Sequence, residues 1–76
     1  MPALTPVKRA RFEKFLKFIG CELKRTAGDH LIYDRPNLKR PVVITADKDV
    51  PVFIIRNNLR TLDMSPEELQ EILKKV

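Results

Sequence analysis

The sequence is poor in the residues that build most metal and nucleotide sites. Its 76 residues include one histidine, one cysteine, two glycines and no tryptophan. A lone His30 and a lone Cys21 cannot supply the paired ligand spacing of a zinc site. The glycines fit neither a GxxxxGK[ST] loop nor a GxGxxG loop, and no GxSxG segment is present. We therefore expect neither a metal nor a cofactor.

Long apolar runs are also missing. No stretch approaches the roughly 20 apolar residues that cross a bilayer, and "MPALTPVKRARF" lacks the apolar core of a signal peptide. Cys21 has no second cysteine for an internal disulfide, which suits a reducing compartment. The sequence thus predicts a cytoplasmic protein without membrane contact. Cys21 is interpreted as a core residue rather than a nucleophile, because it begins an apolar alternation.

Positive charge is distributed unevenly along a chain of net charge +5. Residues 1–46 carry ten Lys and Arg against four Asp and Glu, whereas residues 47–76 carry five against six. A chain of this length forms one domain, residues 1–76, with one modest core. The basic half indicates a polyanionic partner, although a basic surface also serves solubility alone.

Three segments have the apolar spacing of amphipathic helices. Gly20 predicts the end of the first helix, which we place at residues 6–19, because glycine adopts the left-handed conformation at low cost. The start signals are the pairs Thr5-Pro6 and Ser65-Pro66, the segment "DKDVP" near residues 49–52, and Glu68 in a capping box. The three apolar faces are Phe12, Phe15, Leu16 and Ile19; Val52, Ile55, Leu59 and Leu62; and Leu69, Ile72, Leu73 and Val76.

Between the first two helices the apolar period changes to two, which predicts strands in "CELKRT", "HLIYDR" and "VVITA". Their short connections, the turn "AGD" and the loop "PNLKRP", favour antiparallel pairing. The predicted fold is α+β: a two-layer sandwich of order α-β-β-β-α(-α) with a three-stranded antiparallel sheet, as in a double-stranded-RNA-binding domain. One sheet face packs on helices and the other stays free. The last helix packs on its own domain or on a neighbouring copy, which would make a homo-oligomer.

His30 opens the second predicted strand, directly after the glycine turn. Imidazole is the side chain here that transfers protons at neutral pH without a large shift of its pKa. The nearby basic residues are Lys24, Arg25, Arg35, Lys39 and Arg40. An imidazole beside cations suits RNA cleavage, in which the base takes a proton from a ribose 2′-hydroxyl and the cations stabilise the phosphate charge. The alternative is that His30 only decorates a turn.

The arrangement resembles the HicA (YcfA-like) family, small mRNA interferases that are the toxins of type II toxin–antitoxin pairs. The family pattern is a helix ending in glycine, a basic strand, a "GSH" turn, a second strand, a basic loop, a third strand and a "TLRxIL"-like helix. The matching segments here are Gly20, "KRTAGDH" (24–30), "IYDRPNLKRPVVI" (32–44) and "IIRNNL" (54–59). The resemblance spans about residues 7–73.

This resemblance implies endoribonuclease activity on mRNA, with His30 as the essential group and with a HicB-like antitoxin as partner. Gly28 and Asp29 then form the turn that aims His30. Two features depart from the family pattern. Asp29 replaces the serine of "GSH", where it either orients the ring or repels phosphate. The stretch "VVITADKD" also lacks a second histidine that many members carry after the third strand.

These departures leave two other hypotheses open. The first hypothesis is a toxin-type endoribonuclease, and the second is a non-catalytic module that binds RNA or protein on the same scaffold. The third is a structural or purely protein-binding domain. In the first two, the basic residues bind the RNA backbone without base preference, and that affinity weakens with salt. Cleavage of RNA in EDTA, and its loss in His30→Ala, separates the enzyme from the modules.

Overall fold

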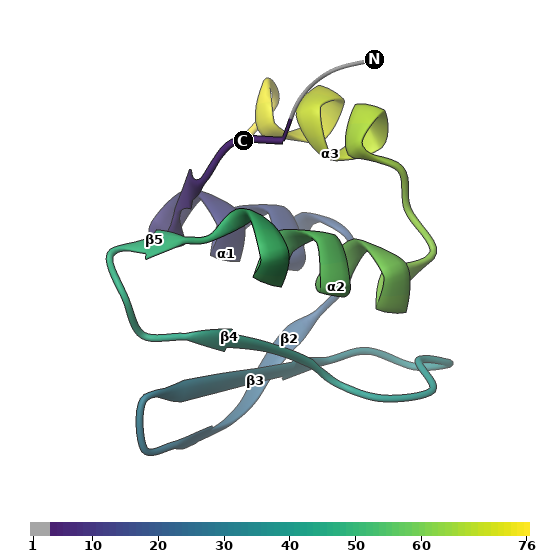
Figure 1. Cartoon of the computed structure of the whole chain (residues 1–76). Coiled ribbons are helices and arrows are strands. Elements are labelled where there is room, and N and C mark those ends of the chain that lie inside the picture. Colours follow the sequence, from purple (N-terminus) through teal and green to yellow (C-terminus); the bar gives the residue numbers. More distant parts are fainter. Residues whose placement is uncertain (1–3) are drawn as a thin grey trace.

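The computed structural model of the protein describes residues 4–76, and the fold is built in three tiers (Figure 1). A twisted sheet forms one side, α1 and α2 lie together on one face of it, and α3 lies on the far side of those two helices. The elements are β1 (Val7–Lys8), α1 (Arg9–Phe18), β2 (Glu22–Ala27), β3 (His30–Asp34), β4 (Val42–Thr45), β5 (Asp49–Val50), α2 (Val52–Leu62) and α3 (Pro66–Leu73). Within residues 4–76, no helix has the length and hydropathy needed to cross a membrane.

The sheet is a meander of order β2-β3-β4, antiparallel throughout. The register pairs Tyr33 with Val42 and Leu31 with Ile44. Tyr33, Val42 and Ile44 are fully buried, which identifies their face as the one that the helices cover. The α+β fold class and the three-stranded antiparallel sheet predicted from the sequence are confirmed. The predicted order lacks β1 and β5, which pair with each other as a separate two-stranded sheet.

The core lies between this sheet face and the helices. Glu13 of α1 accepts a hydrogen bond from the buried Tyr33 hydroxyl. Burial, reinforced by that bond, raises the pKa of Tyr33 well above its ordinary value, so the phenol stays neutral. The core also contains Phe12, Phe15, Leu16, Cys21, Val42, Ile44, Val50, Ile55, Leu59, Leu62 and Leu69.

The end of α1 follows the prediction. Gly20 has a φ of +94°, which an L-residue rarely adopts. The Gly20 amide donates to the Lys17 carbonyl, and the Cys21 amide donates to the Leu16 carbonyl at 2.9 Å. These two bonds form a Schellman motif, and the buried Cys21 and Leu16 supply its apolar contact. The motif turns the chain directly into β2.

The start of α1 differs from the prediction. Thr5 and Pro6 do not begin the helix, because Val7 and Lys8 pair antiparallel with β5 instead. The Arg9 amide donates to the Lys48 carbonyl at 2.9 Å, and the helix begins at Arg9 without a side-chain cap. The predicted helix of residues 6–19 is therefore shorter at its start. A strand partner more than forty residues away leaves no local signal.

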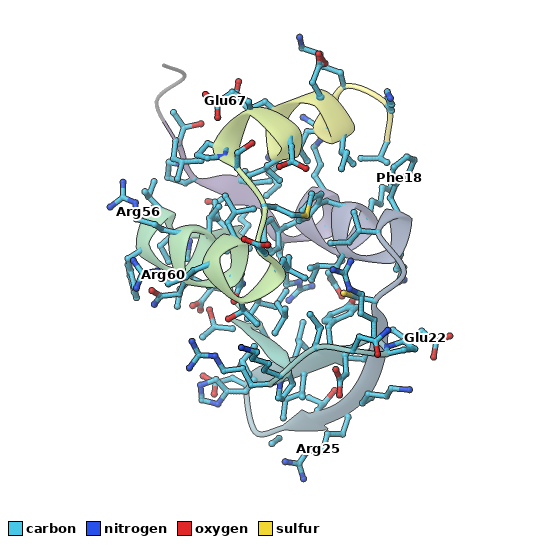
Figure 2. The ribbon with its side chains drawn as sticks, turned by 90° about the vertical axis from the view of Figure 1, so that its right-hand side faces the viewer. Phe18, Glu22, Arg25, Arg56, Arg60 and Glu67 are labelled. Atoms are coloured by element: carbon cyan, nitrogen blue, oxygen red, sulfur yellow. The ribbon has the colours of Figure 1, made fainter. Side chains whose placement is uncertain are left out.

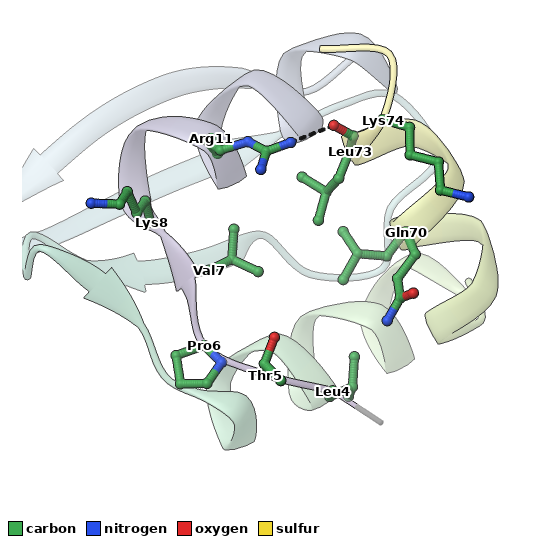
Figure 3. A pocket seen from close by; sticks show the side chains of 10 residues that line it. Leu4, Thr5, Pro6, Val7, Lys8, Arg11, Gln70, Leu73 and Lys74 are labelled. Atoms are coloured by element: carbon green, nitrogen blue, oxygen red, sulfur yellow. Dashed lines mark hydrogen bonds between the residues drawn. The ribbon is translucent and has the colours of Figure 1, made fainter. Parts of the chain in front are cut away.

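The C-terminal helix has the predicted capping box: the Ser65 hydroxyl accepts from the Glu68 amide, and the Glu68 carboxylate accepts from the Ser65 amide. The helix packs on its own domain, against α1, through the buried Leu69. An Arg11 guanidinium donates to the Leu73 carbonyl and ties the end of α3 to α1 (Figure 3). A cavity of about 500 Å³ remains between α3 and the N-terminal segment, with Val7 and Leu73 among its lining residues.

Candidate functional site

His30 is the first residue of β3 and pairs with Ala27 across a two-residue hairpin loop, Gly28-Asp29. Gly28 has a φ of +62°, and Asp29 does not have a positive φ. Glycine at the first loop position with a positive φ is the pattern of a type II′ turn, whose twist matches that of antiparallel strands. The predicted turn is therefore present, and it fixes the backbone from which His30 projects.

The side chain of His30 lies on the sheet face that the helices leave open. Side chains alternate along a strand, and Leu31 and Tyr33 point toward the helices. His30, Ile32 and Asp34 consequently occupy the opposite face. The His30 side chain is 54% exposed. An imidazole in this position can be reached by a large substrate, which a ring under the helices could not be.

Thr45 of β4 is the cross-strand neighbour of His30 on the free face. Its hydroxyl donates to a carboxylate oxygen of Asp47 at 2.9 Å. The Ala46 amide donates to the Asp29 carbonyl at 2.6 Å, which joins the end of β4 to the hairpin loop. Sequence reasoning missed Thr45 and Asp47, because only the register of β3 against β4 brings them beside His30.

Asp29 adds a carboxylate at the hairpin end of the sheet, the corner that also holds His30 and Thr45. Its Oδ1 lies 3.8 Å from Nδ1 of His30, and the Asp29 side chain is 82% exposed. This separation exceeds hydrogen-bond length, so Asp29 does not lock the ring by a direct bond. It acts instead as a nearby negative charge in water.

Two of the predicted basic residues, Lys24 and Arg25, lie on β2 beside this corner. Arg25 pairs with Ile32 and therefore shares the free face with His30; Figure 2 shows it projecting away from the helices. Lys24 sits at the register shift between Leu23 and Arg25, and its ammonium lies 3.4 Å from the Glu22 carboxylate. Arg25 is thus the cation placed closest to the imidazole by the strand pairing.

Arg35, Lys39 and Arg40 are not brought to His30. They follow β3 at the opposite end of the sheet, about 14 Å away along a strand that rises about 3.4 Å per residue. Arg35 is half-buried and donates to the Ile19 carbonyl at 2.8 Å, so it fastens the end of α1. Lys39 and Arg40 are exposed, beside Arg60 of α2.

The Cys21 thiol, which the sequence offers as an alternative reactive group, is inaccessible. Cys21 is 2% exposed. Burial raises the pKa of its thiol; the nearby Arg35 lowers it less, and Asp34 raises it further. A neutral thiol is a poor nucleophile, so the interpretation of Cys21 as a core residue is confirmed. Among residues 4–76, no three His, Cys, Asp or Glu side chains group closely enough to hold a metal ion.

The comparisons with known proteins agree with this geometry. A family model described as the HicA toxin of bacterial toxin–antitoxin systems matches residues 9–64, which include both helices over the sheet, all three of its strands and His30. No curated protein and no solved structure is significantly similar to the chain. Toxins of the matched family cleave mRNA and belong to pairs with an antitoxin. Because the match covers well over half of the sequence, the chain belongs to the HicA toxin family.

Proposed function

We propose that the protein is a toxin-type endoribonuclease that cleaves mRNA without a metal ion, with His30 as its general base. The observation that carries the proposal is the position of the imidazole: it lies exposed on the open face of a sheet whose fold and family are those of mRNA-cleaving toxins.

In this reaction His30 removes the proton of a ribose 2′-hydroxyl, and the resulting oxygen attacks the neighbouring phosphorus. A bond from the 2′-oxygen to phosphorus forms, and the bond from phosphorus to the 5′-oxygen breaks. The leaving oxygen takes a proton from water or from the imidazolium. Arg25, on the same face, offsets the charge that gathers on the phosphoryl oxygens. No step uses a metal or a cofactor.

The remaining predicted residues have different roles in the proposal. Gly28 holds the turn that fixes His30, and Asp29 is a nearby charge that opposes phosphate rather than a ring-orienting partner. Lys24 adds to the positive field along β2, and Lys39 and Arg40 contact the RNA backbone beyond the cleaved bond. We withdraw Arg35 from the RNA contacts, because its guanidinium is already bonded to α1.

The antitoxin, a HicB-like protein, is proposed to cover the open sheet face and with it His30. That face carries apolar as well as charged side chains: Ile32 is half-buried, and Val43 is 38% exposed beside it. An apolar centre with a charged rim is the usual composition of a protein interface. The cytoplasm is the proposed compartment, since mRNA and antitoxin are both made there.

The test is a cleavage assay on single-stranded RNA in EDTA. We expect the wild-type protein to release fragments and His30→Ala to be at least about 100-fold slower, the range that a general base contributes. The control is Lys14→Ala, a change at an exposed position of α1 on the helical side of the molecule. Equal cleavage by wild type and His30→Ala would refute the proposal.

A non-catalytic RNA-binding module is the second candidate. It is favoured by the carboxylates of Asp29 and Asp47, which lie at the imidazole corner where a phosphate would have to bind. This candidate predicts salt-sensitive RNA binding without breakdown. It also predicts that expression without an antitoxin leaves growth unchanged, whereas the toxin stops growth and His30→Ala restores it.

A further inference from the structure

A second candidate site lies at the end of the sheet farthest from His30. Where β4 begins, a cavity of about 380 Å³ opens between that strand and α2. Arg40 lines it from the loop, Val43 from β4, and Asn58 and Arg60 from α2. An adjoining hollow of about 330 Å³ shares Arg40 and Arg60 and adds Lys39.

Asn58 is the unusual member of this lining. It is the buried polar side chain among residues 4–76, with 5% of its surface exposed. Its Nδ2 donor has no hydrogen-bond partner within the described part of the chain. An unpaired buried donor costs free energy, and most buried polar groups in proteins are paired. Asn58 lines the cavity, so its amide stands beside any ligand oxygen that binds there.

The positive charge of the residues that line the cavity favours an anionic ligand. The charged side chains of that lining are Arg40 and Arg60, joined by Lys39 in the adjoining hollow, and neither cavity has a carboxylate in its lining. Figure 2 shows Arg56 and Arg60 projecting on the same side of α2, so a further cation stands one turn away. Guanidinium groups present parallel N–H donors that match the oxygens of a phosphate.

Val43 connects this cavity to the open sheet face. It lines the cavity, and it is also the cross-strand partner of Ile32 on the face that carries His30. A strand of RNA lying over His30 can therefore continue along β4 to the cavity without crossing the helical layer. That continuity, and the repeating phosphates of a nucleic acid, favour RNA over an acidic peptide.

We propose that the cavity between β4 and α2 binds a backbone phosphate of the RNA substrate, several nucleotides from the cleaved bond. Arg40 and Arg60 hold the phosphate oxygens, and the Asn58 amide supplies a further donor. This inference rests on the proposed function for the identity of its ligand as RNA. The cavity sets affinity and the length of RNA that is held, while His30 performs the chemistry.

The first experiment measures RNA binding in the cleavage-deficient His30→Ala background, so that binding is read without breakdown. We expect Arg40→Ala/Arg60→Ala to weaken binding of long single-stranded RNA by about tenfold or more and to reduce the salt slope by about one to two. The matched control, Lys14→Ala/Lys17→Ala, removes two exposed cations from α1 and should weaken binding much less. Equal losses from the two pairs would overturn the proposal.

The second experiment compares cleavage of a dinucleotide with cleavage of long RNA. Only the long RNA reaches the cavity, so Arg60→Ala, which changes a cavity residue of α2, should raise the KM for long RNA and leave dinucleotide cleavage unchanged. An equal loss of cleavage activity on both substrates would overturn the proposal. A variant that binds RNA normally but no longer binds the antitoxin would also overturn it. If His30→Ala still cleaves, the proposed catalytic role fails, while the binding comparison still decides the cavity.

Asn58→Leu separates ligand binding from folding. Replacing an unpaired buried amide with an apolar side chain of similar size is close to neutral or stabilising. We therefore expect an unchanged or higher melting temperature together with several-fold weaker binding of long RNA. Undiminished RNA binding in a stable Asn58→Leu protein would remove Asn58 from the site and overturn its assigned role.

Discussion

The two ends of the three-stranded sheet differ in the charge that they present. At the hairpin end, His30 stands beside Thr45, with the carboxylates of Asp29 and Asp47 at the same corner. At the loop end, arginines of the loop and of α2 line two adjoining hollows without a carboxylate. The difference separates the group suited to proton transfer from the groups suited to holding phosphate. In our proposal, one long RNA strand occupies both ends at once.

The turns at these two ends differ as well. The hairpin loop has its positive φ at Gly28, whereas the loop end has it at Asn37, with a φ of 72°. Arg35 to Leu38 form a turn in which the Leu38 amide donates to the Arg35 carbonyl at 3.4 Å. Proline followed by a residue with positive φ is the type II pattern, and asparagine tolerates that position. The hairpin end therefore has a glycine at its positive-φ position, whereas the loop end has an asparagine.

Gly28→Ala should have the largest effect of the changes that test this comparison. No atom lies within 4 Å of the added Cβ, so the penalty comes from the backbone, at φ +62°. We expect a loss of about 1–2 kcal/mol in the free energy of unfolding, measured by urea denaturation, together with slower RNA cleavage because the turn no longer aims His30.

Gly20→Ala is the matched control, since Gly20 also has a positive φ and open space around its Cα but lies at the end of α1. It should lose comparable stability and keep its cleavage rate at temperatures where the protein stays folded. Similar cleavage rates in the two variants would mean that the hairpin turn does not position the imidazole.

Asp29→Ser should have a smaller effect, in the opposite direction. It removes an exposed carboxylate 3.8 Å from the imidazole and restores the serine of the family pattern. Exposed charge pairs contribute about 0.2–1 kcal/mol, so RNA affinity should rise by a few-fold at low salt, measured by fluorescence anisotropy. Glu71→Gln, which removes a charge from α3, should leave the affinity unchanged. Weaker binding in Asp29→Ser would show that the carboxylate assists the site.

The last prediction concerns Tyr33, which lies between the two ends, and its pH dependence appears in the alkaline range. Burial first, and then the bond to Glu13, raises the pKa of Tyr33. Above about pH 10, the ordinary tyrosine pKa, the unfolded chain loses a proton that the folded protein keeps. Folding stability should therefore fall as the pH rises past that value.

Melting temperatures measured from neutral to alkaline pH test this prediction. Tyr33→Phe should lower the stability at neutral pH by about 1 kcal/mol, through the lost hydrogen bond, and flatten the alkaline decline. A residual decline remains from Cys21, whose thiol pKa is also raised by burial. An alkaline decline as steep in Tyr33→Phe as in wild type would contradict the assignment to Tyr33.

Local signals predicted many of the elements correctly. The capping box at Ser65, the positive φ at Gly20 and the glycine turn before His30 are each settled by residues a few positions apart. The predicted start of α1 was wrong for the opposite reason. Thr5 and Pro6 give a valid helix-start signal, but pairing with β5 satisfies the backbone of the next residues instead.

The same distinction between local signals and long-range contacts applies to the candidate site. The sequence singled out His30 and its basic neighbours, and strand alternation fixed which face His30 occupies. It grouped Lys39 and Arg40 with His30 only because they are near in sequence. Cavities formed by α2, and an unpaired Asn58 within one of them, have no signature in a linear pattern.

By itself the sequence determined the order of the three helices and the three strands of the main sheet, the glycine turn before the histidine and the family to which the chain belongs. These depend on periodicity, caps and turn residues, whose physics acts over a few positions along the backbone. The tertiary structure alone decided that Thr45 stands beside His30, that Arg35 is tied to α1, and that Arg40 and Arg60 line one hollow at the far end of the sheet. These arrangements join residues distant along the chain, so they arise only when the strands have paired and the helices have packed over them.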